Sequence, residues 1–107
     1  MASKTELIAG VKEQSHKLII DTLKKYPEIE KAVVFGSRAM GNHKNGSDID
    51  LAIYGNILES VKIRISSELN EEKPLPYHFD VVAYDNTDNK ELKDHIDKFG
   101  KAIYTKE

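Results

Sequence analysis

The pattern of apolar residues in the first third of the chain predicts one helix followed by one strand. Apolar positions recur every three or four residues from 7 to 23, and residues 3–6 have capping-box spacing, so we expect a helix ending near Lys25, before Pro27. Residues 31–35 are almost wholly apolar, which indicates a strand that is buried on both faces and leads into Gly36.

The middle of the chain shows two further patterns. Residues 48–54 alternate between two faces, with the large aliphatic side chains at positions 49, 51 and 53 on one of them, which predicts a second strand. Residues 57–71 carry a helical stripe of apolar positions. Positions 61, 63 and 65 also alternate as in a strand, but the length of the segment and its lack of turn signals favour a helix.

The last third of the chain predicts a strand, a short helix and an edge strand. Residues 77–84 form the third strand pattern, after a loop that contains two prolines. Residues 88–91 have the spacing of a helix cap, and Gly100 is a natural end for the helix that follows. Residues 101–104 then predict an edge strand. His16 and His95 lie on predicted helices without ligand-spaced companions, so we interpret both as structural or exposed.

Together these elements predict an α/β (α+β) fold, in which a small mixed β-sheet has helices packed mainly on one face. A chain of 107 residues supports one domain, 1–107, with one modest core and no separate substrate-binding domain.

Composition narrows the classes of partner. The formal net charge of −2 and the pI of about 6.1 argue against a strong phosphate-backbone footprint, so nucleic acid is not the expected partner. The chain has no cysteine, which excludes disulfides and thiolate metal sites. It has neither an apolar run of membrane-spanning length nor a signal peptide, so we expect a cytoplasmic protein that does not associate with membranes.

Two aspartates at the start of the second strand pattern are the unusual feature of this chain. Residues i and i+2 of a strand point the same way, so Asp48 and Asp50 are expected side by side on one sheet face. Two carboxylates roughly 6 Å apart at an effective dielectric near 20 repel each other by about 2 to 3 kcal/mol. A cation between them would remove this cost, and Mg²⁺, which combines carboxylates with water and phosphate, fits best.

The residues just upstream suit a phosphate group. Gly36 allows close approach of backbone, and Ser37 offers a hydroxyl and an amide, so the two predict a site for a metal-bound nucleoside triphosphate. Arg38, or alternatively Lys44, would neutralise phosphate charge. The spacing of Gly36 and Gly41 matches the start of a P-loop, but the required Lys and Ser/Thr are absent.

A third carboxylate interrupts the apolar run of the third strand pattern. Asp80 would be costly there if it were buried without a partner. It should therefore face the Asp48 and Asp50 site or find another partner.

These motifs resemble a known family. Gly36-Ser37, a spacer, and Gly46-Ser47-Asp48-Ile49-Asp50-Leu51 are similar to the glycine-serine and Asp-x-Asp signature of polymerase-β-like nucleotidyltransferases. The fuller string from Phe35 to Ile53 is most similar to the minimal nucleotidyltransferases, small proteins that are often paired with a HEPN-domain protein.

The resemblance implies a polymerase-β-like nucleotidyltransferase fold, a mechanism and a set of site residues. One or two Mg²⁺ ions would be held by Asp48, Asp50 and Asp80, with Asp80 either binding the activating ion or accepting the hydroxyl proton. Phosphate contacts would come from four residues of the signature: Gly36, Ser37, Arg38 and Ser47.

The resemblance also implies a donor, an acceptor and a biological role. The donor would be ATP, and AMP would pass to a hydroxyl, expected to be a tyrosine, of a HEPN-type helical toxin. The protein would then be an antitoxin in a stable complex, with more than one copy of the chain as an option.

Two other functions remain open at this point. The protein could instead bind nucleotide and partner without catalysis and neutralise the partner by occlusion. An RNA-modifying transferase is disfavoured, because the chain is mildly acidic and has no basic, aromatic-rich segment.

Overall fold

The computed structural model describes residues 11–36, 48–72 and 75–106 of the chain. Two short turns accompany the regular elements: the π-helical turn η1 (Glu68–Glu72) and the 3₁₀ turn η2 (Tyr84–Asn86). The helices and strands are, in chain order, α1 (Glu13–Lys24), β1 (Lys31–Phe35), β2 (Ile49–Tyr54), α3 (Glu59–Ser67), β3 (Phe79–Ala83), α4 (Lys90–Phe99) and β4 (Lys101–Thr105). Within the described ranges, no helix is both long enough and apolar enough to cross a bilayer.

The strands form one mixed sheet in the order β3-β2-β1-β4. β1 is antiparallel to both of its neighbours, β2 and β4, whereas β2 and β3 run parallel. Parallel neighbours need a crossover connection, and α3 with η1 provides it. The expected mixed sheet and the edge position of β4 are therefore confirmed.

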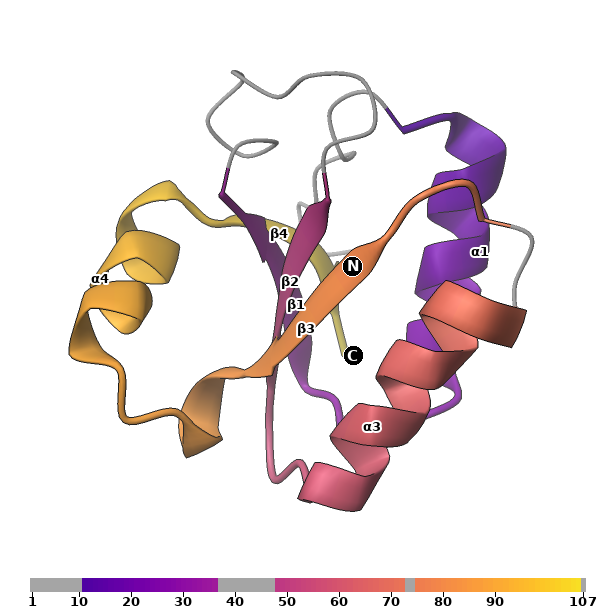
Figure 1. The fold of residues 1–107 in the computed structure, drawn as a ribbon. Helices are drawn as coiled ribbons and strands as arrows, with labels where there is room; N and C mark the ends of the chain where they lie inside the picture. The colour runs from indigo at the N-terminus through magenta and orange to yellow at the C-terminus, as the bar shows by residue number, and fades with distance from the viewer. Residues whose placement is uncertain (1–10, 37–47, 73–74, 107) are drawn as a thin grey trace.

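Helices cover the two faces of the sheet unequally (Figure 1). α1 and α3 pack on one face, where Ile19, Leu23 and Ile65 meet the apolar side chains of β1, β2 and β3 in the main core. α4 packs on the other face through Ile96, which joins Val33, Phe35 and Ala52 in a smaller cluster. The prediction that helices pack mainly on one face is confirmed, and the second face is partly covered by α4.

The start of the first helix differs from its prediction. Val11 and Lys12 lie outside the helix, and Lys12 is extended, with φ −65° and ψ 150°. α1 begins at Glu13, so the expected continuous helix from the capping box is wrong at these two positions. Gly10 weakens helical conformation just before them. The capping box at residues 3–6 lies outside the described residues, and the expected end near Lys25 is confirmed by α1 ending at Lys24.

The later elements follow their predictions closely, with one shift at a cap. Residues 57–71 form a helix rather than a strand, although α3 starts at Glu59 and continues into the π-helical turn. The cap of α4 is Asn89 rather than Asp88, because the Asn89 Oδ1 accepts the Leu92 N–H at 3.1 Å.

Gly100 ends α4 because of a close approach and not because of a special backbone angle. Its φ is −65°, which any residue can adopt. An added Cβ, however, would lie 2.4 Å from both the Ile96 carbonyl oxygen and the Val33 Cγ1. The tight corner between α4 and β4 therefore requires glycine.

Replacing Gly100 by Ala is expected to lower the free energy of unfolding by about 1 to 3 kcal/mol, the usual cost of forcing extra atoms into a packed site. Urea unfolding measures the change. The matched control is Lys98→Ala at an exposed position of the same helix, expected to change stability by no more than about 0.5 kcal/mol. A Gly100→Ala variant as stable as the wild type would contradict the steric explanation.

Candidate active site

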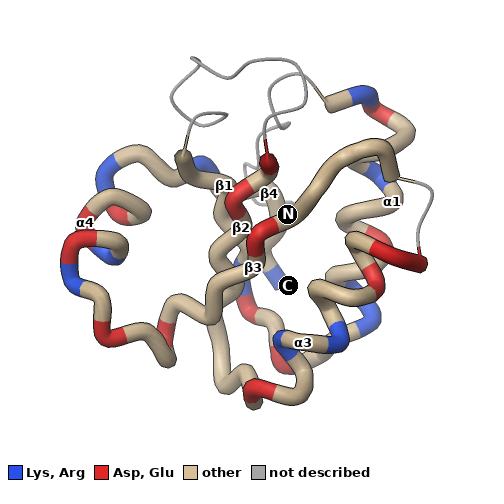
Figure 2. Tube along the Cα trace, viewed as in Figure 1, with Lys and Arg blue, Asp and Glu red and all other residues tan. Residues whose placement is uncertain are grey.

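Two aspartates occupy opposing positions on the parallel strands β2 and β3. The register pairs Asp50 with Asp80, so their side chains share the sheet face on which α4 packs. Figure 2 shows acidic positions in red on the neighbouring strands β2 and β3. The register places Asp50 opposite Phe35, the last residue of β1. Asp48 lies just before β2, with 59% of its side chain exposed.

The pKa of Asp50 is raised by burial and in part because the carboxylates of Asp80 and Asp48 lie nearby. Burial raises the pKa of Asp50, and the negative charges of Asp80 and Asp48 raise it further, whereas a positively charged His95 imidazole would lower it. Asp50 is therefore a carboxyl group whose ionised form is disfavoured by its surroundings. A cation at this position would reverse that balance.

Gly36 brings the end of β1 against the carboxylate of Asp50. The register places Phe35 opposite Asp50, and Gly36 follows with a φ of +76°. A Cβ at Gly36 would lie 2.1 Å from the Asp50 Oδ2. Both the left-handed backbone and the lack of space therefore require glycine here.

The N–H of Gly36 is donated to a histidine from α4. The Gly36 nitrogen lies 3.2 Å from the His95 Nε2. Sequence reasoning had interpreted His95 as structural or exposed, and it gave no sign of this contact. The two residues are 59 positions apart, and no local periodicity links them.

Two more polar side chains near the carboxylates had no functional interpretation from the sequence. The His78 Nδ1 lies 3.6 Å from the Asp48 Oδ1, with both side chains mostly exposed. Asn70, in the π-helical turn, accepts the Phe79 N–H at 2.7 Å and donates to the Phe79 carbonyl oxygen at 3.0 Å. Asn70 thus fixes the backbone of β3 immediately before Asp80.

Several predicted site residues lie outside the described residues. They are Ser37, Arg38, Ser47 and the alternative phosphate-binding cation, Lys44. Their roles stay predictions. In the described part of the chain, no group of three or more histidine, aspartate or glutamate side chains is arranged to hold a metal ion by itself. The pair Asp50 and Asp80, with Asp48 nearby, instead fits an ion that keeps water or phosphate among its ligands.

A cavity of about 500 Å³ opens beside Asp80, between α3 and the free edge of β3. Its walls include His78 and Asn70. Ile63 of α3 also lines it, with 57% of this apolar side chain exposed. Asp80 also lines the cavity, so a molecule bound there would lie beside one of the three aspartates.

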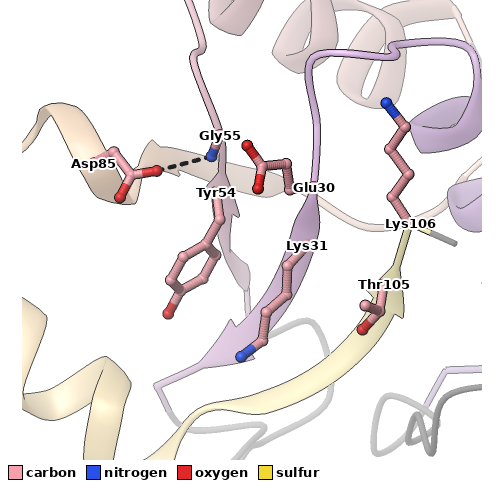
Figure 3. A pocket seen from close by; sticks show the side chains of 7 residues that line it. All are labelled: Glu30, Lys31, Tyr54, Gly55, Asp85, Thr105 and Lys106. Carbon is pink, nitrogen blue, oxygen red and sulfur yellow. Dashed lines mark hydrogen bonds between the residues drawn. The ribbon is translucent and has the colours of Figure 1, made fainter.

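A somewhat larger cavity, of about 590 Å³, lies at the opposite end of the sheet (Figure 3). It is lined by Glu30, Lys31, Tyr54, Gly55, Asp85, Thr105 and Lys106. Several of its polar groups are already engaged: the Gly55 N–H is donated to Asp85 at 2.8 Å, and Lys106 donates to the Pro27 carbonyl oxygen at 2.9 Å. None of the three clustered aspartates lines this cavity. We therefore locate the candidate site by its carboxylates and not by cavity size.

Comparison with known proteins was made by sequence and by structure. Residues 17–107 match the family model described as polymerase beta, nucleotidyltransferase. No curated protein matches the chain.

Several solved structures share the fold. A toxin-antitoxin structure with AMP-PNP has a TM-score of 0.72 and 21% identity, over 86% of this chain and 74% of that one. The MntA-HepT toxin-antitoxin has a TM-score of 0.68 and 18% identity, over 89% and 74% of the two chains. A structure of a tri-AMPylated Shewanella oneidensis HEPN toxin in complex with an MNT antitoxin has a TM-score of 0.67 and 18% identity, over 88% of this chain and 72% of that one. At these identities the similarity shows the fold.

Asp50→Asn is expected to stabilise the metal-free protein near neutral pH, and the gain should disappear in acid. The folded-state pKa of Asp50 is raised above its ordinary value of 3.8, so its ionisation costs folding free energy at pH values above both pKa values. As the pH falls from the raised pKa to 3.8, the folded carboxyl takes up a proton first and this cost is lost. Thermal unfolding in a chelator, at neutral and acidic pH, measures the difference.

The matched control for this experiment is Asp88→Asn, at an exposed position before α4. Its stability should stay close to that of the wild type at every pH. An Asp50→Asn protein that is less stable than the wild type at neutral pH would show that this carboxylate is favourably paired in the free protein.

Proposed function

This chain belongs to the polymerase beta nucleotidyltransferase family, and we propose that it transfers AMP from ATP to a hydroxyl group of a partner protein. The observation that carries the proposal is the alignment of Asp50 with Asp80 on one sheet face, with the Gly36 backbone against Asp50. Carboxylates beside a close backbone approach are what a site for metal-bound triphosphate requires.

The residues present fit a divalent cation. Asp50 is disfavoured as an anion by burial and by two neighbouring carboxylates, so a bound cation would relieve both effects. Oxygen ligands of this kind suit Mg²⁺. Asp48 and Asp50, with Asp80 beside them, would hold one or two such ions. When bound, Mg²⁺ would neutralise phosphate charge and make the acceptor hydroxyl more acidic.

The chemical step follows from the roles of the carboxylates. The acceptor oxygen forms a bond to the α-phosphorus of ATP, and the bond from that phosphorus to the bridging α–β oxygen breaks. Pyrophosphate leaves with the electron pair, and Asp80 accepts the hydroxyl proton. Asp80 is exposed, so it can pass this proton to solvent. Gly36, Ser37, Arg38 and Ser47 would bind the phosphates, with Gly36 contributing close approach because its own N–H is donated to His95.

The acceptor is proposed from the structural comparisons. Chains of the same fold occur in toxin-antitoxin structures, one of which contains a tri-AMPylated HEPN toxin. We therefore assign the acceptor hydroxyl to a tyrosine of a HEPN-type helical protein and the antitoxin role to this chain. The cavity between α3 and β3 gives such a side chain a route to Asp80. Since the donor is ATP, we place the reaction in the cytoplasm.

Asp48→Ala and Asp50→Ala are each expected to slow AMP transfer by at least about 100-fold. Losing about 3 kcal/mol of transition-state stabilisation has this effect, and carboxylate-bound metal ions supply several kcal/mol. ATP labelled at the α-phosphate, incubated with Mg²⁺ and the HEPN-type partner, measures label on the partner.

Asp88→Ala, at an exposed position away from the carboxylates, is the control and should transfer label at the wild-type rate. If both Asp48→Ala and Asp50→Ala retained transfer, the assignment of these carboxylates to the catalytic site would be wrong. Inhibition of the partner without label would instead support occlusion, and label on RNA would support an RNA-modifying transferase.

A further inference from the structure

We infer that His95 is a positioning residue for nucleotide binding, acting through the hydrogen bond that it accepts from the Gly36 N–H. Its kinetic consequence rests on the proposed nucleotidyl transfer, whereas the hydrogen bond itself is independent of that function. His95 belongs to α4 and Gly36 to the end of β1, so the bond ties a helix to the bend beside the carboxylates.

The imidazole of His95 is held in place by two aromatic rings. The ring of Phe35, which is only 6% exposed, meets it edge-on at a centroid distance of 6.0 Å. The ring of Phe99 lies 5.2 Å away, tilted by 47°. Packing restricts how far the imidazole can rotate, so its Nε2 faces the Gly36 nitrogen at 3.2 Å as a fixed acceptor.

The direction of this hydrogen bond specifies the chemical state of His95. An Nε2 that accepts an N–H carries no proton, so the imidazole is neutral and protonated at Nδ1. A lysine or arginine could not replace it, because neither side chain can accept a hydrogen bond. The required property is therefore an acceptor at the position of the Nε2.

The hydrogen bond holds the backbone of Gly36, which is already restricted by its conformation and by its contact with Asp50. Gly36 has a φ of +76° and approaches Asp50 so closely that a Cβ would overlap the Oδ2 at 2.1 Å. With its N–H held by His95, the peptide plane between Phe35 and Gly36 is fixed relative to Asp50. Gly36 is itself a proposed phosphate-contact residue, so the hydrogen bond fixes the backbone of a residue in the proposed nucleotide site.

Two substitutions separate hydrogen bonding from ring packing. His95→Gln keeps an acceptor near the Nε2 position but removes the ring, and His95→Phe keeps a ring but removes the acceptor. We expect His95→Phe to raise the KM for ATP about 3- to 10-fold, the effect of losing one hydrogen bond, with a smaller change in kcat. We expect His95→Gln to stay within about 2-fold of the wild type. Lys98→Ala, an exposed position on α4, is the control.

The opposite order would overturn the inference. A His95→Phe variant with the wild-type KM, together with a raised KM for His95→Gln, would show that the ring acts by packing alone. Thermal unfolding of both variants checks that neither KM change reflects partial unfolding.

A second measurement does not depend on catalysis. In ¹⁵N-labelled protein, the hydrogen bond should give a scalar coupling between the Gly36 nitrogen and the His95 Nε2, and the imidazole shifts should report the Nδ1–H tautomer. Affinity for a non-hydrolysable ATP analogue with Mg²⁺ is expected to fall in His95→Phe and to persist in His95→Gln.

The two proposals can fail separately. If the wild-type protein transfers no label, the proposed function fails, and His95 is then judged by the coupling and by analogue affinity. If the coupling is absent, or if all variants bind the analogue equally, the positioning role of His95 fails even when label is transferred.

Discussion

The parallel pairing of β2 with β3 is the constraint on which the candidate site depends. It places two like charges, Asp50 and Asp80, directly opposite each other, an arrangement that destabilises a sheet unless something offsets it. The offset comes from the other face of the same strands. Ile49, Leu51 and Ile53 are completely buried there beneath α1 and α3. The sheet thus derives its stability from one face and presents its carboxylates on the other.

The connection between these strands protects their register. A slip of one residue would turn Asp80 towards the core and Phe79 towards the carboxylates. Asn70 opposes such a slip, because its side chain holds both the N–H and the carbonyl oxygen of Phe79. The same contact uses outward backbone groups of an edge strand that would otherwise be free to pair with another chain. The π-helical turn that carries Asn70 therefore supports the strand that carries Asp80.

Hydrophobic periodicity predicted most of the fold, and an interrupted pattern predicted the central pair of the site. The strands, α3 and α4 follow local alternation or helical stripes, so their positions were accessible from the sequence. Asp80 stood out because it breaks an apolar run, and the structure places it opposite Asp50. The start of α1 was misjudged because apolar spacing continued through Val11 and Lys12, where the backbone is extended.

Contacts over long sequence separations were not accessible in this way. The hydrogen bond from Gly36 to His95 joins residues that are 59 positions apart, and no local sequence pattern around either residue predicts the contact. Nor could the sequence show that the Gly36 N–H is donated to a histidine. Such contacts depend on the position of α4 on the sheet, and tertiary packing determines that position.

The placement of α4 explains why the candidate site lies at one end of the sheet face that this helix covers. At the far end of β2 and β3, Tyr54 and Tyr84 stack at 4.3 Å, and the Tyr84 hydroxyl donates to Asp97 of α4 at 2.7 Å. Burial raises the pKa of Tyr54 to about 12, so its phenol stays protonated at neutral pH. α4 is thus tied to the sheet at two separate places, by Asp97 to Tyr84 and by His95 to Gly36. Because the helix is fixed at both places, its packing on the sheet helps to set the position of Gly36 beside Asp50.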